Sequence, residues 1–194
     1  MRPLAGLRVV DMADEKGELC GRLFADLGAD VIRVEPPQGA VSRRLPPFVP
    51  GTDASLYFAV RNAGKRGCAM DLGTDDGREA LHALLARADI CVESHAPGTL
   101  AQQGLGPGQL LARHPNLVVT SITDFGQTGP YRGYRGTDMI GFAMGGMMHR
   151  AGSPERPPVV APGALAYDTA GTTAAFAPLL ADWKRLQTGR GQPL

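Results

Sequence analysis

A single carboxylate, Asp168, stands directly before an alanine-rich segment with the composition of a helix. Upstream, the apolar stretch 117–123 runs into a loop that contains Gly126, Gly129 and Pro130. This pattern indicates a strand that ends in a loop, and loops held by a rigid scaffold often carry reaction sites. A carboxylate at a helix start can serve as a nucleophile, or it can simply cap the helix. Asp168 is therefore the candidate catalytic residue.

Basic residues gather in the first third of the chain. They are Arg33, Arg43, Arg44, Arg61, Lys65 and Arg66. The net charge is only +1, which argues against a general nucleic-acid binder. The cluster is either a solvated basic face or a landing site for a polyanionic ligand, which lysine and arginine side chains would neutralise.

The elements that must position these residues alternate between strands and helices. Strands are predicted at 7–12, 30–35, 68–72, 90–93 and 117–123. Helices are predicted at 18–27, 75–88, 99–103, 108–114, 138–148 and 169–187. The stretch 36–50 is rich in proline and is expected to run over the surface. The alternation predicts an α/β fold: a Rossmann-like, doubly wound, mostly parallel sheet with ligands at the carboxyl ends of its strands.

The composition excludes several other classes of protein. The 194 residues, 43% of them apolar, suit one domain of an enzyme without a membrane partner. No apolar run approaches the roughly 20 residues needed to cross a bilayer, and no signal peptide is recognisable, so a cytoplasmic location is expected. Cys20, Cys68 and Cys91 are few and widely spaced, which predicts buried, inert thiols.

Common cofactor motifs are missing from the sequence. The residues after the first strand, 13–17, lack the glycine spacing of a dinucleotide site, and no Walker loop or catalytic-serine elbow occurs. The four histidines are scattered without the spacing of metal ligands. We therefore expect neither a metal nor a permanently bound cofactor.

Several segments, taken in order, resemble the family III CoA-transferases over essentially the whole chain. They are 3–11, 27–35, 62–66, 88–94, 97–98, the loop 126–130, Asp168 and 188–192. The resemblance implies that residues 1–194 form the N-terminal part of the family's large domain, without the small domain and the C-terminal return segment. It also implies a homodimer of interlinked subunits for the full-length protein, and weak CoA binding with poor turnover for this piece alone.

The same resemblance implies roles for individual residues. Asp168 matches the family's nucleophile, and the substrates are an acyl-CoA and a carboxylic acid acceptor. The positions that match CoA-contacting residues are Lys16, Gly17, Lys65, Arg66, Met70, Asp71, Leu72, Gly73, Ser94, His95, Ala96, Gln102, Arg135, Gly136, Thr137 and Asp138. Two segments depart from the family pattern: Glu35 is followed by proline, and the loop after the first strand carries Asp14 and Glu15.

Two alternatives remain beside CoA transfer. One is an enzyme similar to the α-methylacyl-CoA racemases of the same family, in which a histidine and an aspartate exchange a proton. That histidine falls where this chain has Thr137, and threonine is not a base near neutral pH. The other alternative is a non-catalytic CoA-binding half of a larger protein.

Overall fold

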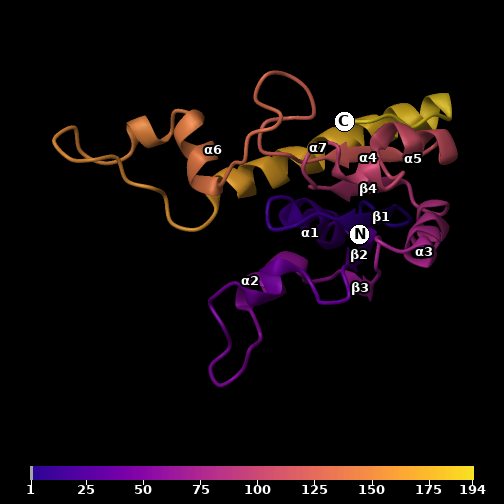
Figure 1. Ribbon diagram of the computed structural model, residues 1–194, viewed down its shortest axis with the longest axis horizontal. Coiled ribbons are helices and arrows are strands. Elements are labelled where there is room, and N and C mark those ends of the chain that lie inside the picture. The colour runs from indigo at the N-terminus through magenta and orange to yellow at the C-terminus, as the bar shows by residue number, and fades with distance from the viewer. Residues whose placement is uncertain (1) are drawn as a thin grey trace.

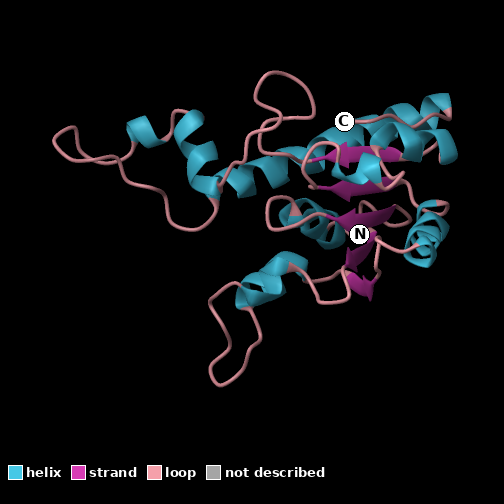
Figure 2. Ribbon diagram, viewed as in Figure 1, coloured by secondary structure: helices cyan, strands magenta, loops and turns pink. Residues whose placement is uncertain are grey.

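The computed structural model describes residues 2–194 and contains one sheet of five parallel strands (Figures 1 and 2). The strands are β1 (Arg8–Met12), β2 (Asp30–Glu35), β3 (Arg66–Ala69), β4 (Ile90–Glu93) and β5 (Val118–Ser121). Their order across the sheet is β3-β2-β1-β4-β5, so the chain moves to one side of β1 and then to the other. The predicted fold class is confirmed.

Alternating side chains of the strands build two hydrophobic cores, one on each face of the sheet. Val9 lies opposite Val31 and Ile90 in the register, and these three belong to one core. Val10 and Cys91 are paired in the same way on the other face. Because both faces of the sheet are covered over β1, β2, β4 and β5, most residues of these strands are buried, whereas the edge strand β3 is largely exposed.

Seven α-helices surround the sheet within residues 2–194. They are α1 (Glu18–Asp26), α2 (Leu56–Asn62), α3 (Asp75–Leu85), α4 (Thr99–Gln102), α5 (Pro107–Arg113), α6 (Asp138–Met144) and α7 (Leu165–Thr188), with short 3₁₀ helices at Val41–Arg44 and Met148–Arg150. Helices α1 and α7 pack on one face, whereas α3, α4 and α5 pack on the other. No helix in this part of the chain is long and apolar enough to span a membrane.

The segment before α2 and the segment between α6 and α7 both extend away from the sheet (Figure 1). The first contains the predicted surface stretch, although residues 41–44 form a 3₁₀ turn within it. Helix α2 follows it and was not predicted. Ser55 caps this helix, since its Oγ accepts a hydrogen bond from the Phe58 N–H at 3.1 Å.

The start of α6 at Asp138 is confirmed, but the predicted end of α6 and the predicted start of α7 were wrong. Helix α6 ends at Met144, before Gly146, whose φ of 77° suits a glycine. Helix α7 begins at Leu165, so Asp168 lies in its first turn and not before it. The Asp168 N–H donates to the Ala164 carbonyl at 2.8 Å, as an ordinary helical residue does. The capping interpretation of Asp168 is therefore wrong.

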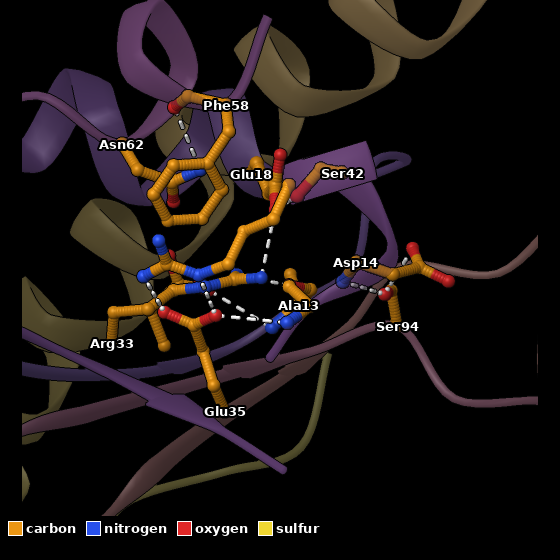
Figure 3. A network of polar contacts seen from close by, with 12 residues as sticks. Ala13, Asp14, Glu18, Arg33, Glu35, Ser42, Phe58, Asn62 and Ser94 are labelled. Atoms are coloured by element: carbon orange, nitrogen blue, oxygen red, sulfur yellow. Dashed lines mark hydrogen bonds and ion pairs between the residues drawn. The ribbon is translucent and has the colours of Figure 1, made fainter. Parts of the chain in front are cut away.

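Four charged side chains, Asp11, Glu18, Arg33 and Lys65, form a buried cluster, of which Figure 3 labels Glu18 and Arg33. The Lys65 ammonium contacts Asp11 Oδ2 at 2.7 Å, and Arg33 Nη2 contacts Glu18 Oε1 at 2.7 Å. All four side chains are at most 4% exposed, and their formal charges cancel. Burial raises the pKa of Glu18, against the opposing effects of Arg33 and the Ser42 hydroxyl.

Gly21 makes room for this cluster. A Cβ at Gly21 would overlap Asp11 Oδ2 and lie 3.1 Å from Lys65 Nζ. Gly21→Ala is therefore expected to lower the free energy of unfolding by about 1–3 kcal/mol, because a buried ion pair must move.

Gly108 in α5 is the matched control, since its Cβ would meet nothing within 4 Å. Gly108→Ala is expected to raise stability by roughly 0.5–1 kcal/mol. Urea denaturation measures the free energy of unfolding of both variants, and equal changes in the two would contradict the steric argument.

Candidate functional site at the carboxyl edge of the sheet

Three adjoining clefts lie where the strands end. The first, of about 280 Å³, is bounded by residues that end β1 and β2, among them Met12 and Glu35. The second, of about 520 Å³, lies beyond β4 and β5, and shares His95 with the first. The third, of about 190 Å³, shares Lys16 with the second and reaches Tyr167, the neighbour of Asp168. We call these three clefts, which adjoin one another at His95 and Lys16, the cleft path. The path lies at the edge that α/β folds use for ligands, and its third cleft reaches the neighbour of Asp168, although Asp168 itself does not line it.

Eleven of the sixteen predicted CoA-contacting residues line this path. The first cleft has Met70, Asp71, Leu72, Gly73 and His95. The second has Lys16, Ser94, His95, Ala96, Arg135 and Gly136. The third has Lys16, Gly136 and Thr137. The structure thus brings together segments far apart in the sequence. It also adds one basic side chain that was not predicted, because Arg132 lines the second cleft together with Lys16 and Arg135.

The acidic loop after β1 is held by hydrogen bonds to Ser94, which follows the neighbouring strand β4. Asp14 Oδ1 accepts a hydrogen bond from Ser94 Oγ at 2.6 Å (Figure 3). The same oxygen accepts from the Lys16 N–H at 3.1 Å. Asp14 Oδ2 lies 3.2 Å from Lys16 Nζ. Burial alone would lower the pKa of Lys16, but Asp14 beside it outweighs that effect and holds the pKa above its ordinary value. The Asp14 carboxylate thereby fixes a protonated lysine at the cleft.

Lys65 and Arg66 do not lie on the path, contrary to the sequence-based expectation. The Lys65 side chain is 1% exposed, and its ammonium donates to Asp11 Oδ2, to the Glu18 carbonyl and to Asn62 Oδ1 at 2.7–2.8 Å. Arg66 lies at the amino end of β3, on the opposite edge of the sheet, and forms a bidentate pair with Asp30. The two adjacent residues differ in environment because Lys65 precedes β3 and reaches under α1 to Asp11, whereas Arg66 begins the exposed edge strand.

Three further predicted residues lie off the path for local reasons. Gly17 is packed under the loop, where a Cβ would come within 2.9 Å of Ala13 Cβ. Gln102 is exposed on α4, whereas its neighbour Gln103 lines the first cleft. Asp138 caps α7, since its Oδ1 accepts from the Tyr167 N–H at 2.9 Å. Asp138 thus positions the turn that carries Asp168.

Asp124 is a cleft residue that the sequence did not single out. Its Oδ2 accepts from the Gly136 N–H at 3.0 Å, and its Oδ1 is buried without a hydrogen-bond partner among the described residues. It borders the second and third clefts. Burial, and then the Asp124 charge, raise the pKa of Tyr167. This buried acceptor beside the cleft suits a hydrogen-bond donor on a bound molecule.

Asp168 pairs with an arginine from a helix more than a hundred residues earlier. Arg61 Nη1 donates to Asp168 Oδ1, and the Arg61 guanidinium lies 4.4 Å above the ring centroid of Tyr57. The Arg61 side chain is 11% exposed, and that of Asp168 is 37% exposed. Burial would lower the pKa of Arg61, but the Asp168 hydrogen bond and Tyr57 more than offset it and raise that pKa. A carboxylate that is 37% exposed and paired with a largely buried arginine is accessible to a substrate while its position is held by the ion pair.

Arg61 and Tyr57 were missed as site residues. Arg61 belongs to the basic cluster that the sequence shows, but nothing local connects it to Asp168. Ser55 followed by an apolar run was the available sign of a capped helix. Recognising α2 would have placed both residues on one turn.

Comparison with known proteins agrees with this arrangement. A sequence model described as CoA-transferase family III matches residues 4–194. Subunit BbsE of succinyl-CoA:(R)-benzylsuccinate CoA-transferase from Thauera aromatica is 44% identical over 188 residues, which are 95% of this chain and 46% of that protein. Succinyl-CoA:D-citramalate CoA-transferase from Chloroflexus aurantiacus is 38% identical over 98% of this chain and 48% of that protein.

Among solved structures, a CAIB/BAIF family protein from Brucella suis superposes with a TM-score of 0.94 at 39% identity. The superposition covers 99% of this chain and 52% of that one. The present chain therefore spans about half the length of the relatives it matches.

Proposed function

This chain belongs to CoA-transferase family III, and on that premise we propose that the protein transfers CoA from an acyl-CoA to a carboxylic acid. The single observation that supports this best is the position of Asp168. Its carboxylate is 37% exposed, lies in the first turn of α7 beside Tyr167, which lines the third cleft, and is paired with Arg61. The substrate names of the relatives suggest a succinyl donor for assays.

We place CoA along the three clefts. Its adenosine fits the first cleft, where Met70–Gly73 leave the sheet. Its phosphates carry negative charge and fit the second cleft, where Lys16, Arg132 and Arg135 converge. The thioester end then enters the third cleft beside Tyr167. In this placement Lys65 and Arg66 take no part in binding.

The reaction we propose has four steps that return Asp168 to its starting state. The Asp168 carboxylate attacks the thioester carbonyl, and the C–S bond breaks. CoA leaves as a thiolate, and a mixed anhydride between Asp168 and the acyl group remains. The thiolate attacks the aspartyl carbonyl, which forms an aspartyl-CoA thioester and releases the donor acid as a carboxylate. The acceptor carboxylate then attacks this thioester, expels the CoA thiolate and forms a second anhydride with Asp168. The thiolate finally attacks the acceptor carbonyl of this anhydride, which forms the new acyl-CoA and frees the Asp168 carboxylate. Covalent catalysis divides one difficult exchange into easier steps.

The racemase alternative is disfavoured by Thr137. Its Oγ1 accepts a hydrogen bond from the Ile140 N–H at 3.3 Å and so caps α6, and a threonine hydroxyl is not a base near neutral pH. The alternative of a non-catalytic CoA-binding module leaves Asp168 without a role, because binding alone does not require a carboxylate near the thioester.

An assay with succinyl-CoA and a panel of acids tests the proposal. We expect loss of the donor thioester only when an acceptor acid is present. Incorporation of solvent deuterium at the α-carbon without an acceptor would instead indicate racemisation. If neither reaction occurs but CoA raises the melting temperature, the protein is a binding module and the proposal of transfer is wrong.

A further inference from the structure

We propose that Arg61 is a binding site for the carboxylate of the acid substrate, used while Asp168 is covalently blocked. This inference rests on the proposed function and adds a second role to the same site. The ligand class is a small organic carboxylate, which takes the place that the Asp168 carboxylate holds at rest.

The Arg61 guanidinium is held in place by its neighbours and can still donate further hydrogen bonds. The Tyr57 ring supports it from below at 4.4 Å, and it lies on the last turn of α2, which Ser55 caps at the other end. Its hydrogen bond to Asp168 Oδ1 is the only one that it donates within residues 2–194. A guanidinium has five N–H groups, so donors remain for a second acceptor approaching from the exposed side of Asp168.

The proposed reaction breaks the ion pair between Arg61 and Asp168 and forms it again in each turnover. When Asp168 becomes an anhydride or a thioester, it loses its negative charge, whereas arginine stays protonated. A largely buried cation would then lack a counterion, which is costly. The donor acid leaves, and the acceptor acid arrives, as an anion at this stage. A carboxylate bound to Arg61 therefore restores the charge balance and sits beside the aspartyl carbonyl.

Neighbouring acids cannot substitute for the substrate. Glu18 is the other carboxylate that acts on the pKa of Arg61. Its Oε1 accepts from Arg33 at 2.7 Å and from Ser42 Oγ at 2.5 Å, whereas its Oε2 has no hydrogen-bond partner among residues 2–194. The charge of Glu18 is already balanced within the buried cluster that it forms with Asp11, Arg33 and Lys65. Glu18 is also fully buried. The counterion must therefore come from the bound acid, and Arg61 alternates between Asp168 and that acid during each turnover.

A binding experiment without turnover tests this inference. In Asp168→Ala the guanidinium loses its partner, and formate has the size of the group removed. We expect formate to raise the melting temperature by about 3–5 °C at roughly ten times its Kd, relative to chloride at equal ionic strength. In the double variant Asp168→Ala, Arg61→Met, the two salts should act alike. Equal stabilisation of both variants by formate, or no stabilisation of the single variant, would overturn the inference.

Steady-state kinetics give a second test that does not depend on the folding of Asp168→Ala. Arg61→Lys keeps the charge but not the planar fork, so we expect the KM for the acceptor acid to rise about tenfold while the KM for acyl-CoA changes little. An equal rise in both KM values would contradict a carboxylate site. Absence of transfer in the unmodified protein would refute the proposed function, whereas the formate experiment would still judge Arg61.

Discussion

Replacing Asp168 by asparagine is expected to lower the rate of CoA transfer by roughly 10³-fold or more. An amide cannot form the mixed anhydride, so the covalent route is lost altogether. The fold should survive, because Asp168 is 37% exposed and its helical hydrogen bond to Ala164 comes from the backbone. Turnover of succinyl-CoA with an acceptor acid, compared with circular dichroism of the same samples, provides the measurement.

Asp182→Asn is the matched control for that substitution. Asp182 lies on the same helix and also pairs with an arginine, since Arg185 Nη2 is 2.7 Å from Asp182 Oδ1. It lies far from the clefts, near Asp89 at the start of β4, because Arg185 also binds Asp89. We expect this variant to keep its activity. If both variants lose activity equally, the loss reflects the helix and not a nucleophile.

Lys65→Met is expected to cost about 3–5 kcal/mol of unfolding free energy. The substitution leaves the Asp11 carboxylate, which is fully buried, with only Arg33 at 3.8 Å as a cationic neighbour. Two buried carboxylates would then share one guanidinium. Chemical denaturation measures the loss, and a marginally stable domain will show it as reduced soluble yield.

The adjacent residue supplies the control. The Arg66 and Asp30 side chains are 66% and 43% exposed, and exposed ion pairs contribute at most about 1 kcal/mol. Arg66→Met should therefore change stability little, and neither variant should act by removing a phosphate contact. If Arg66→Met weakened CoA binding while the protein remained folded, the cleft path proposed for CoA would be wrong.

The sheet could be predicted because its signals are local. The strands are short apolar runs separated by helices of regular period, and parallel pairing follows from that alternation. The segments 70–73 and 94–96 could be placed at the site for the same reason, since residues that leave parallel strands meet at one edge. These elements needed no knowledge of distant contacts.

The missed features depend on tertiary contacts. Whether Lys65 faces a ligand or a buried aspartate is decided by Asp11, which is 54 positions away in the sequence. The pairing of Arg61 with Asp168 spans 107 positions. The start of α7 was placed too late because Asp138, from another helix, satisfies its first turn. Sequence periodicity carries no information on such partners.

Mass spectrometry of the protein during turnover tests the central claim most directly. After incubation with an acyl-CoA and rapid quenching, peptide mapping is expected to find CoA joined as a thioester to the peptide that contains Asp168, and hydroxylamine should remove it. The adduct should be absent from Asp168→Asn and present in Asp182→Asn. An adduct on another residue, or active transfer with an unmodified Asp168 peptide that persists in Asp168→Asn, would contradict the assignment of Asp168 as the nucleophile.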